Sequence, residues 1–364
     1  MKIKEVISYL ESFAPLSLQE DYDNSGLIIG NPDAELTGIL ITIDSIEEVV
    51  QEAIDKNLNL IISHHPVIFS GLKKINGKNY IEKTVLKAIK NDIAIYAAHT
   101  NLDSVSGGVN SKIAQKLNLK NTRILSNSLN QLIKLVYFVP VQQAEETRKA
   151  VFEAGAGHIG NYDMCSFNVE GKGTFKAREN TNPFVGKKGE IHTENEIRVE
   201  VILPKQIKNN VIQALISAHP YEEVAYDLYA LENEYTGSGI GIIGELENEM
   251  NELDFLNQLK SLFNAKCIRY TGLLDKPIKK AALCGGSGSF LLNRAIAEKA
   301  DVFISADFKY HQFFDANNKI LIADIGHFES EQFTKELIYE LLIKKFPKFA
   351  VHLSEINSNP INYL

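Results

Sequence analysis

Short apolar strands alternate with amphipathic helices in two stretches of the chain, which flank a middle segment of different character. In the first stretch, strands are expected at residues 38–44, 58–62 and 93–98, separated by helical patterns at 46–56 and 80–90. Strands joined by helices of this length predict right-handed crossovers and a mostly parallel sheet. Binding sites in such sheets form at the carboxyl ends of the strands.

The same alternation returns from about residue 251 to the end of the chain. The expected elements are a helix at 253–263, a strand at 279–283, a helix at 291–299, strands at 302–305 and 320–324, a helix at 327–345 and a strand at 350–353. A glycine run, Gly285 to Gly288, follows the strand at 279–283. It lacks the Lys-Ser/Thr of a P-loop, so a tight strand-to-helix turn is favoured over a phosphate cradle.

The middle segment predicts a separate inserted domain. Its expected elements are strands at 133–139, 165–176 and 198–203, helices at 144–154 and 207–218, and an exposed loop or flap at 178–196. Two strand-helix units in one small antiparallel sheet predict a ferredoxin-like α+β domain. We therefore divide the chain into a first α/β half at 1–126, an inserted domain at 127–235 and a second α/β half at 236–364, with a hinge at 237–241.

Composition and charge indicate a globular protein with a sizeable core. Of the 364 residues 45% are hydrophobic, and the formal net charge is −8. This acidic balance disfavours nucleic-acid binding, because each phosphate contact needs a cation. Three widely separated cysteines indicate reduced thiols. The amino terminus predicts an amphipathic helix at 3–13 rather than a signal peptide, and no stretch approaches the roughly 20 apolar residues that span a bilayer. We expect a cytoplasmic protein with no membrane partner.

Two neighbouring histidines, His64 and His65, close the strand at 58–62. Adjacent imidazoles at a strand end are poor core residues and good metal ligands. On an extended chain their rings point to opposite sides unless the strand is already turning there, so a site in which each ring binds a different ion fits better than one ion between both. For the pair alone, two structural histidines at a sheet edge are an equal alternative.

Two further strand ends carry matching chemistry. Asp103, four residues after His99, could bridge two divalent ions or cap a helix, and His99 could be a ligand, orient a ligand or transfer protons. His327 and Glu331 are four residues apart at the start of a predicted helix, which places them on one face, whereas Glu329 should point elsewhere. In isolation an exposed ion pair is the commoner explanation of that spacing.

Taken together, these residues form a candidate ligand set: His64, His65, Asp103, His327 and Glu331. Three imidazole nitrogens and two carboxylates suit zinc, iron or manganese better than calcium or magnesium. The sequence therefore predicts a site for two divalent ions, zinc first, in which His99 is the candidate catalytic group.

Ordered motifs along essentially the whole chain resemble one known family. They are Asp23-Asn24-Ser25-Gly26-Leu27, Ser63-His64-His65-Pro66-Val67-Ile68-Phe69, Ala98-His99-Thr100-Asn101-Leu102-Asp103, Gly107-Gly108-Val109-Asn110, Gly285-Gly286-Ser287-Gly288, Ala306-Asp307-Phe308-Lys309-Tyr310-His311, Gly326-His327-Phe328-Glu329-Ser330-Glu331 and Asn359-Pro360-Ile361. This set closely resembles the Nif-three-like family, often named GTP cyclohydrolase I type 2 homologues, in its long bacterial form.

The resemblance implies a fold, an assembly and two candidate functions. The fold would be two similar α/β halves forming one core that holds a dinuclear metal centre at the five ligand positions, with the insertion as a PII-like domain. The assembly would be a ring-shaped homohexamer. The function would be that of a metal-dependent hydrolase acting on a nucleotide or related small molecule, with a GTP-like substrate opened at C8. The alternative is a non-catalytic metal- or metabolite-binding regulatory protein.

Two polar groups stand outside this set. Asp307, Lys309 and His311 follow a predicted strand and could line the same cleft or form a salt-bridged loop. The other group is His219, Tyr221, Glu222 and Glu223. It ends a helix of the inserted domain and could form a second ligand site, although a solvated helix end is favoured.

Overall fold

The computed structural model describes residues 1–364, and the chain divides into two compact units. The first unit comprises Met1–Asn127 and Thr236–Leu364, and the second is Ser128–Tyr235. None of the helices combines the length and the apolar character needed to cross a lipid bilayer.

The first unit contains two sheets, of which one has five strands. In sheet order these strands are β1 (Gly26–Ile29), β4 (Ala94–Ala97), β3 (Leu60–Ser63), β2 (Ile39–Thr42) and β15 (Val351–Leu353). The four strands from β4 to β15 are parallel, and β1 runs antiparallel to β4. Every residue of β2, β3 and β4 is buried. Burial of whole strands is typical of a parallel sheet covered on both faces.

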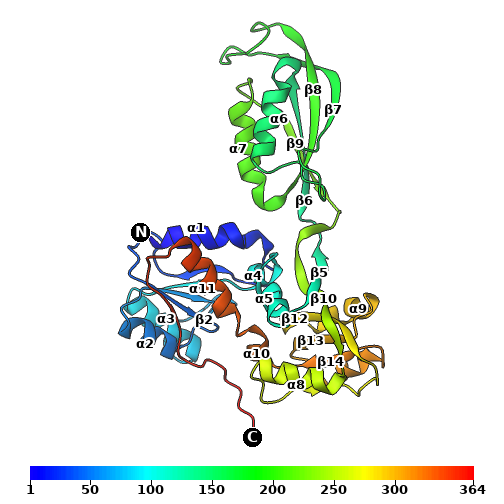
Figure 1. The fold of residues 1–364 in the computed structure, drawn as a ribbon. Coiled ribbons are helices and arrows are strands. Elements are labelled where there is room, and N and C mark those ends of the chain that lie inside the picture. Colours follow the sequence, from blue (N-terminus) through cyan, green and yellow to red (C-terminus); the bar gives the residue numbers. More distant parts are fainter. The chain divides into compact units, whose positions relative to one another are not determined.

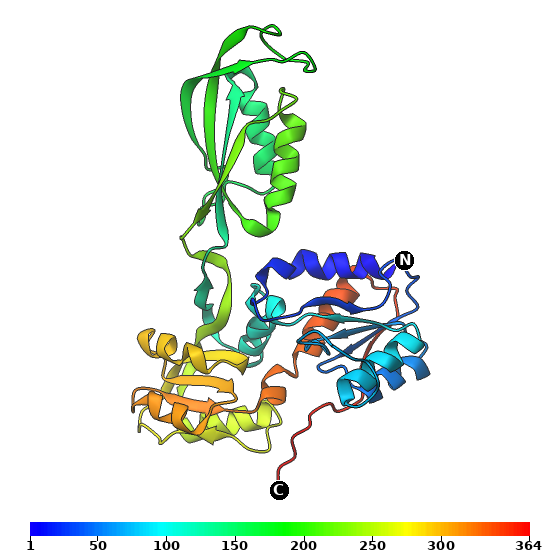
Figure 2. The ribbon, with the colours of Figure 1, turned by 180° about the vertical axis from the view of Figure 1, so that it is seen from behind.

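Helices cover both faces of the five-stranded sheet (Figures 1 and 2). Their bounds are α1 (Ile3–Phe13), α5 (Val109–Lys116) and α11 (Thr334–Lys345) on one face, and α2 (Glu47–Asp55) and α3 (Tyr80–Lys90) on the other. Alternate strand residues enter the two cores: Ile39 and Ile41 pack with α1, whereas Leu40 packs with α2 and α3.

The other sheet of this unit has six strands. In sheet order these are β11 (Arg269–Tyr270), β14 (Leu321–Asp324), β13 (Val302–Ala306), β12 (Ile278–Ser287), β10 (Tyr235–Met250) and β5 (Lys120–Ser128). The central strands β12, β13 and β14 are parallel, whereas β10 runs antiparallel to β12 and β11 runs antiparallel to β14. The expected mostly parallel sheet is therefore right for the strands joined by helices and wrong at the edges. The packing helices are α8 (Glu252–Leu262) and α9 (Leu292–Ala297).

Each of the two chain segments of the first unit contributes one strand to the sheet that the other segment mainly builds. β5 belongs to the six-stranded sheet, and β15 pairs with β2 in the five-stranded sheet, with Val351 opposite Ile39. One hydrophobic cluster runs from α1 to α8 and includes residues of both sheets. The two stretches of alternating pattern are thus interlocked, which the sequence pattern does not indicate because strand pairing is non-local.

Several expected boundaries are wrong. The predicted helix at 327–345 is two helices, α10 (His327–Glu331) and α11, and the residues between them include the buried Phe333, whose ring packs on Phe263 with centroids 5.4 Å apart. Gly285 and Gly286 lie inside β12 rather than in a turn, and the expected hinge at 237–241 lies inside β10. Glycine favours turns only locally, and pairing with neighbouring strands overrides that preference.

The remaining short helices of the first unit lie in its connections. They are α4 (Thr100–Ser104), η1 (Leu16–Leu18), η4 (Ser289–Leu291) and η5 (Tyr310–Ala316).

The second unit has the element order β-α-β-β-α-β. Its elements are β6 (Leu132–Pro140), η2 (Val141–Gln143), α6 (Ala144–Glu153), β7 (Phe167–Lys176), β8 (Ile191–Pro204), η3 (Lys205–Ile207), α7 (Lys208–Ala218) and β9 (Tyr226–Leu231). The sheet order is β7-β8-β6-β9 and every pair is antiparallel. Both helices pack on one face, where Leu135 and Val201 meet Val151 and Leu215. The expected loop at 178–196 ends earlier, because residues 191–196 pair with β7.

Candidate metal centre

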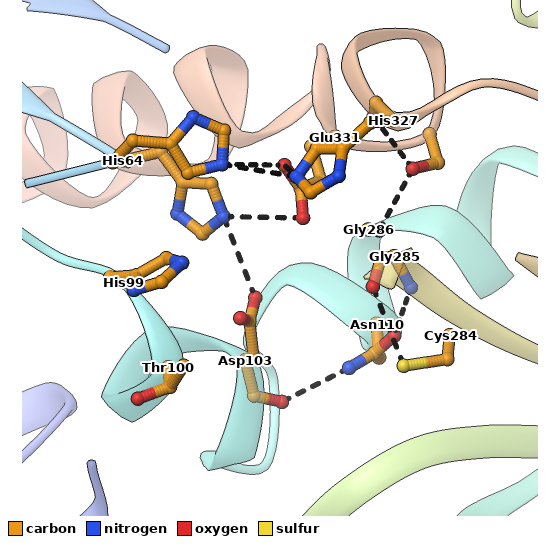
Figure 3. Close-up of polar contacts among 12 residues, drawn as sticks. His64, His99, Thr100, Asp103, Asn110, Cys284, Gly285, Gly286, His327 and Glu331 are labelled. Atoms are coloured by element: carbon orange, nitrogen blue, oxygen red, sulfur yellow. Dashed lines mark hydrogen bonds and ion pairs between the residues drawn. The ribbon is translucent and has the colours of Figure 1, made fainter. Parts of the chain in front are cut away.

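Three strand ends bring the predicted ligands together in the first unit. His64 and His65 follow β3, His99 follows β4 and leads into α4, and α10 follows β14 after two residues. Figure 3 shows His64, Asp103, His327 and Glu331 converging, with Asp103 and Glu331 coming from different helices. The sequence reasoning therefore predicted which residues meet, although β3 and β14 belong to different sheets.

The two neighbouring histidines point into the same cluster. β3 ends at Ser63, and His64 and His65 lie in a bend, with ring centroids 4.9 Å apart. Both backbone N–H groups donate to Ile43 O, His64 at 3.1 Å and His65 at 2.9 Å. The strand has therefore already turned at these residues, which is the case in which the rings are not expected to point to opposite sides.

The imidazole nitrogens and carboxylate oxygens of this cluster lie close to one another. Nε2 of His64 is 3.7 Å from Asp103 Oδ1 and 3.7 Å from Glu331 Oε1. The Nε2 atoms of His65 and His327 lie 3.0 and 3.1 Å from Glu331 Oε2, and 3.3 Å from each other. Glu331 thus stands among all three imidazoles.

Each of the three imidazoles is anchored through its other nitrogen. Nδ1 of His64 donates to the carbonyl of Ala98 at 2.8 Å. Nδ1 of His65 donates to Asp44 at 2.7 Å, and Nδ1 of His327 donates to Asp307 at 2.6 Å. These contacts fix the ring orientation and leave Nε2 directed at the cluster, which is the arrangement that metal-ligating histidines usually show.

His99 adjoins His64 and His65, with which it forms a group that could hold a metal ion, and a carboxylate of its own anchors it. Its Nδ1 donates to Asp23 Oδ1 at 2.7 Å, and Asp23 Oδ2 accepts hydrogen bonds from Thr100 and Ser25. The His99 ring makes edge contacts with His64 and His65, with centroids 5.3 and 5.4 Å away. Burial would raise the pKa of Asp23, but these hydrogen bonds and the imidazole outweigh it and hold that pKa well below its usual range.

The charges of the cluster favour a cation at its centre. Burial disfavours protonation of His65 and His327, yet the surrounding carboxylates outweigh it and raise their pKa values to about 9 and about 11. Burial likewise opposes ionisation of Glu331, but the imidazoles of His64 and His327 lower its pKa well below the ordinary value. At Asp103, by contrast, the neighbouring imidazoles do not outweigh burial, so its pKa lies above the ordinary value.

Three buried polar atoms of the cluster have no hydrogen-bond partner, namely Nε2 of His64, Oδ1 of Asp103 and Oε2 of Glu331. Such orphaned buried groups cost free energy, typically about 1–3 kcal/mol each. Divalent ions bound here would give these atoms a partner, so the residues present fit a metal site.

The glycine run, Gly285 to Gly288, packs against the cluster and does not present free N–H groups to a phosphate. The N–H groups of Gly285, Gly286 and Gly288 already donate to Asn110 Oδ1, Ser330 Oγ and Ser305 Oγ, each at 2.9 Å. A Cβ added at Gly286 would lie 2.2 Å from Glu331 Oε1. The run is therefore needed for the close approach of β12 to α10.

Of the group after β13, one residue belongs to the site. Asp307 accepts the hydrogen bond from Nδ1 of His327. Lys309 precedes η5, and the His311 ring contacts the exposed rings of Tyr310 and Phe314. Neither Lys309 nor His311 lines the cavity beside the cluster. Of the two alternatives given for this group, lining the same cleft is therefore wrong for Lys309 and His311.

The sequence reasoning missed Asp23 and Asp44 as partners of histidines. Asp44 had an available signal, since it lies at the carboxyl end of β2 in a parallel sheet. Asp23 had only its place in the first of the resembling motifs, which does not indicate its partner, because it precedes β1 and reaches His99 only through the fold. Glu329 points away from the cluster, as expected, and accepts from Asn359 Nδ2 at 3.1 Å.

A cavity of about 1010 Å³ opens beside the cluster in the first unit. Its wall includes His65, His99, Asp103, His327 and Glu331. The thiol of Cys284 also lines it, and burial raises the pKa of that thiol so that it stays protonated. A small molecule could therefore reach the donor atoms directly.

Fold and site together define an α/β protein with a buried histidine and carboxylate cluster that can hold metal ions. The family model for Duf34/NIF3 (NGG1p interacting factor 3) matches residues 1–360, and the chain belongs to this family. The resemblance noted in the motifs is thereby confirmed.

Proteins of known name and known structure agree along the full length. A protein of Halalkalibacterium halodurans named GTP cyclohydrolase 1 type 2 homolog is 40% identical over 99% of this chain and 98% of its own, and one of that name from Bacillus subtilis is 38% identical over the same shares. The crystal structure of a Bacillus cereus protein related to NIF3 has a TM-score of 0.84 at 40% identity, covering 100% of this chain and 99% of that one. Staphylococcus aureus protein SA1388 has a TM-score of 0.78 at 31% identity over the same shares.

Proposed function

We propose that the protein binds two divalent metal ions and acts as a metal-dependent hydrolase on a nucleotide or related small molecule. Its ligands would be His64, His65, Asp103, His327 and Glu331. One observation carries the proposal: three imidazoles present Nε2 to one buried carboxylate while every Nδ1 is anchored. Nitrogen and carboxylate donors suit zinc first, with iron or manganese as alternatives.

The reaction would combine bound ions with a proton carrier. Two bound ions would act as Lewis acids and lower the pKa of water at the site. His99 would take up and return the proton, because Asp23 holds its Nδ1 and leaves Nε2 for transfer. Asp23 in this scheme is a positioning residue, which fixes the ring orientation of His99.

The cavity supports a substrate with a planar ring. Its wall carries four strongly exposed aromatic side chains, which are Tyr22, Phe69, Tyr80 and Phe290. Exposed rings of this kind stack on bases whatever their sequence. Lys83 lines the same cavity and could meet a phosphate group. The printed name of the relatives, GTP cyclohydrolase 1 type 2 homolog, agrees with a nucleotide substrate.

Turnover of metal-loaded protein tests the proposal. We expect hydrolysis of GTP, another nucleotide or a phosphoester by the wild type, and loss of that activity together with metal in His65→Ala and Glu331→Gln. The matched control is Glu329→Gln, which alters a buried carboxylate of the same helix that points away from the cluster. Equal rates in the wild type and His65→Ala would refute the hydrolase.

The role of His99 requires a separate variant. We expect His99→Asn to keep its metal content and to lose about 10²- to 10⁴-fold in turnover number, the usual contribution of a general acid or base. Loss of metal in this variant would instead make His99 a ligand.

A non-catalytic regulatory protein is the second candidate function. A specific observation favours it, namely that the second unit has a cavity of its own, about 590 Å³ in volume. We infer that this unit is a ferredoxin-like, PII-like inserted domain, as its β-α-β-β-α-β order supports. Metals or metabolites that raise the unfolding temperature, with no turnover under any metal, would decide for this function.

We also propose self-association into a homohexamer. This assembly rests on the family resemblance alone, and sedimentation equilibrium of the full chain tests it. A monomer at micromolar concentration would refute it.

A further inference from the structure

The cavity of the second unit lies entirely among residues of Ser128–Tyr235. Its wall includes Phe138, Phe175, Phe184, Tyr221 and Glu196. Phe184 belongs to the segment between β7 and β8, and Glu222 accepts a hydrogen bond at 2.8 Å from the backbone N–H of Asn182 in that segment. The segment is thus fixed at one edge of the cavity.

A buried carboxylate without a cationic partner lies in this wall. The side chain of Glu196 is more than nine-tenths buried, and its Oε1 accepts from the hydroxyl of Tyr221 at 2.8 Å. Arg198, on the same strand, pairs with Glu200 at 2.9 Å instead. Carboxylates buried to this degree are normally paired with a cation.

The nearby His219 does not serve as that cation. Its Nε2 donates to the carbonyl of Phe138 at 2.8 Å, and its Nδ1 accepts from the N–H of Tyr221 at 3.1 Å. An imidazole that accepts at Nδ1 is neutral, and burial lowers the pKa of His219 accordingly.

Aromatic rings line the same cavity as this carboxylate, and they cluster on Tyr221, which contacts it. The Tyr221 ring is 6.1 Å from that of Phe175 and 6.3 Å from that of Phe184, with interplanar angles of 57° and 52°. Ring faces attract cations, and several rings beside one carboxylate are the arrangement that recognises alkylated ammonium groups. The basic residues of the wall, Lys172, Lys176 and Arg198, are all exposed, whereas Glu196 is buried.

We propose that this cavity binds an organic cation, an alkylated ammonium group whose charge meets Glu196 and whose apolar substituents lie against Phe175, Phe184 and Tyr221. The site is made by the second unit alone, so it does not depend on the metal centre or on the hydrolase. It also accounts for the polar residues at the end of α7, because His219 fixes the backbone of Tyr221 and Tyr221 orients the carboxylate.

Calorimetry on the full chain with two probes of the same shape tests the proposal. Choline carries the charge, and 3,3-dimethylbutan-1-ol is its neutral counterpart. We expect saturable binding of choline and binding of the neutral alcohol weaker by at least about tenfold. Glu196→Gln should remove that preference, and Tyr221→Phe should reduce it. The matched control Glu170→Gln changes an exposed carboxylate of the same wall and should preserve choline binding.

A second variant covers the case in which Glu196→Gln does not fold. A Cβ added at Gly173 would lie 2.1 Å from Glu196 Oε2, so Gly173→Ala should displace the carboxylate and weaken choline binding. Equal affinity for both probes would overturn the proposal. So would ATP binding that depends on Lys172 and Lys176 in a protein that does not bind choline, since the site would then recognise anions.

Discussion

At the scale of single residues, carboxylates outside the ligand set decide how the cluster is arranged. Asp44 and Asp307 each accept from Nδ1 of a histidine, and Asp23 does the same for His99. These three residues come from three separate parts of the chain. They orient the rings before any metal binds, so part of the ordering cost is already met by folding.

Replacing Asp307 should weaken metal binding without unfolding the protein. Asp307 has φ of 57°, a conformation that asparagine also tolerates, so Asp307→Asn changes the charge and leaves the backbone. We expect metal affinity to fall about 10- to 100-fold. Competition with a chromogenic chelator measures it. Asp315→Asn, at an exposed position, should bind like the wild type.

Gly286→Ala should impair the site through its side chain. Gly286 has φ of +62°, where an alanine costs about 1–2 kcal/mol, and the added Cβ would also displace Glu331. We expect lower stability by at least that amount and metal affinity reduced by about tenfold or more. Gly160→Ala is the control, because Gly160 has φ of +59° with nothing near its Cβ position. If both variants bind metal equally well, Gly286 has no role in placing Glu331.

At the scale of elements, the ends of β3 and β14 determine where the ligands point. β3 stops at Ser63, and its bend turns two adjacent histidines into one cluster. α10 is a single short helix that places His327 and Glu331 beside that bend, and it ends before Phe333, which packs on Phe263. A continuous helix from 327 to 345 would be expected from periodicity alone.

The attachment of α2 to the carboxyl-terminal segment should respond to pH. Glu52 is buried and accepts from Ser354 Oγ at 2.5 Å, from the N–H of Glu355 at 3.0 Å and from Lys56 at 2.8 Å. Burial would raise its pKa, but these contacts outweigh it and hold that pKa below 4.5. A carboxyl with a lowered pKa stabilises the fold above its unfolded pKa, and this contribution is lost as the pH falls through the folded pKa.

Glu52→Gln should therefore destabilise the protein by about 1–3 kcal/mol at pH 7. The difference from the wild type should be unchanged at pH 6 and should shrink below about pH 4.5. Urea unfolding at these pH values measures it. Glu48→Gln, at an exposed position of the same helix, should change stability by less than about 0.5 kcal/mol. A constant difference down to low pH would show that ionisation of Glu52 does not stabilise the fold.

At the scale of the whole molecule, the second unit is inserted between neighbouring strands. β5 leads into it and β10 leads out of it, and the two strands are adjacent in the six-stranded sheet. The second unit has its own hydrophobic cluster, separate from those of the first unit. Adjacent chain ends and a separate core are the features of an insertion that a host fold tolerates.

Replacing Ser128–Tyr235 with an Asn-Gly turn should leave the first unit folded. β5 and β10 would then be joined directly, a connection that adjacent strands accept. We expect one cooperative thermal transition and the metal stoichiometry of the full chain, measured by calorimetry and elemental analysis. Non-cooperative unfolding of this variant would show that the first unit depends on the second.

The sequence by itself determined the elements and the chemistry of the site. Helical and strand periodicities are local, so α1 and α3 begin and end where the pattern predicts. The convergence of His64, His65, Asp103, His327 and Glu331 could also be predicted, because strand ends of parallel sheets are where side chains gather.

Only the tertiary structure decided which way those side chains point and what holds them. The exchange of β5 and β15 between sheets, the anchoring of His99 by Asp23 and the packing of Gly286 on Glu331 all join residues far apart in the chain. Such contacts depend on how buried surfaces fit together in three dimensions, and no local pattern in the sequence records that fit.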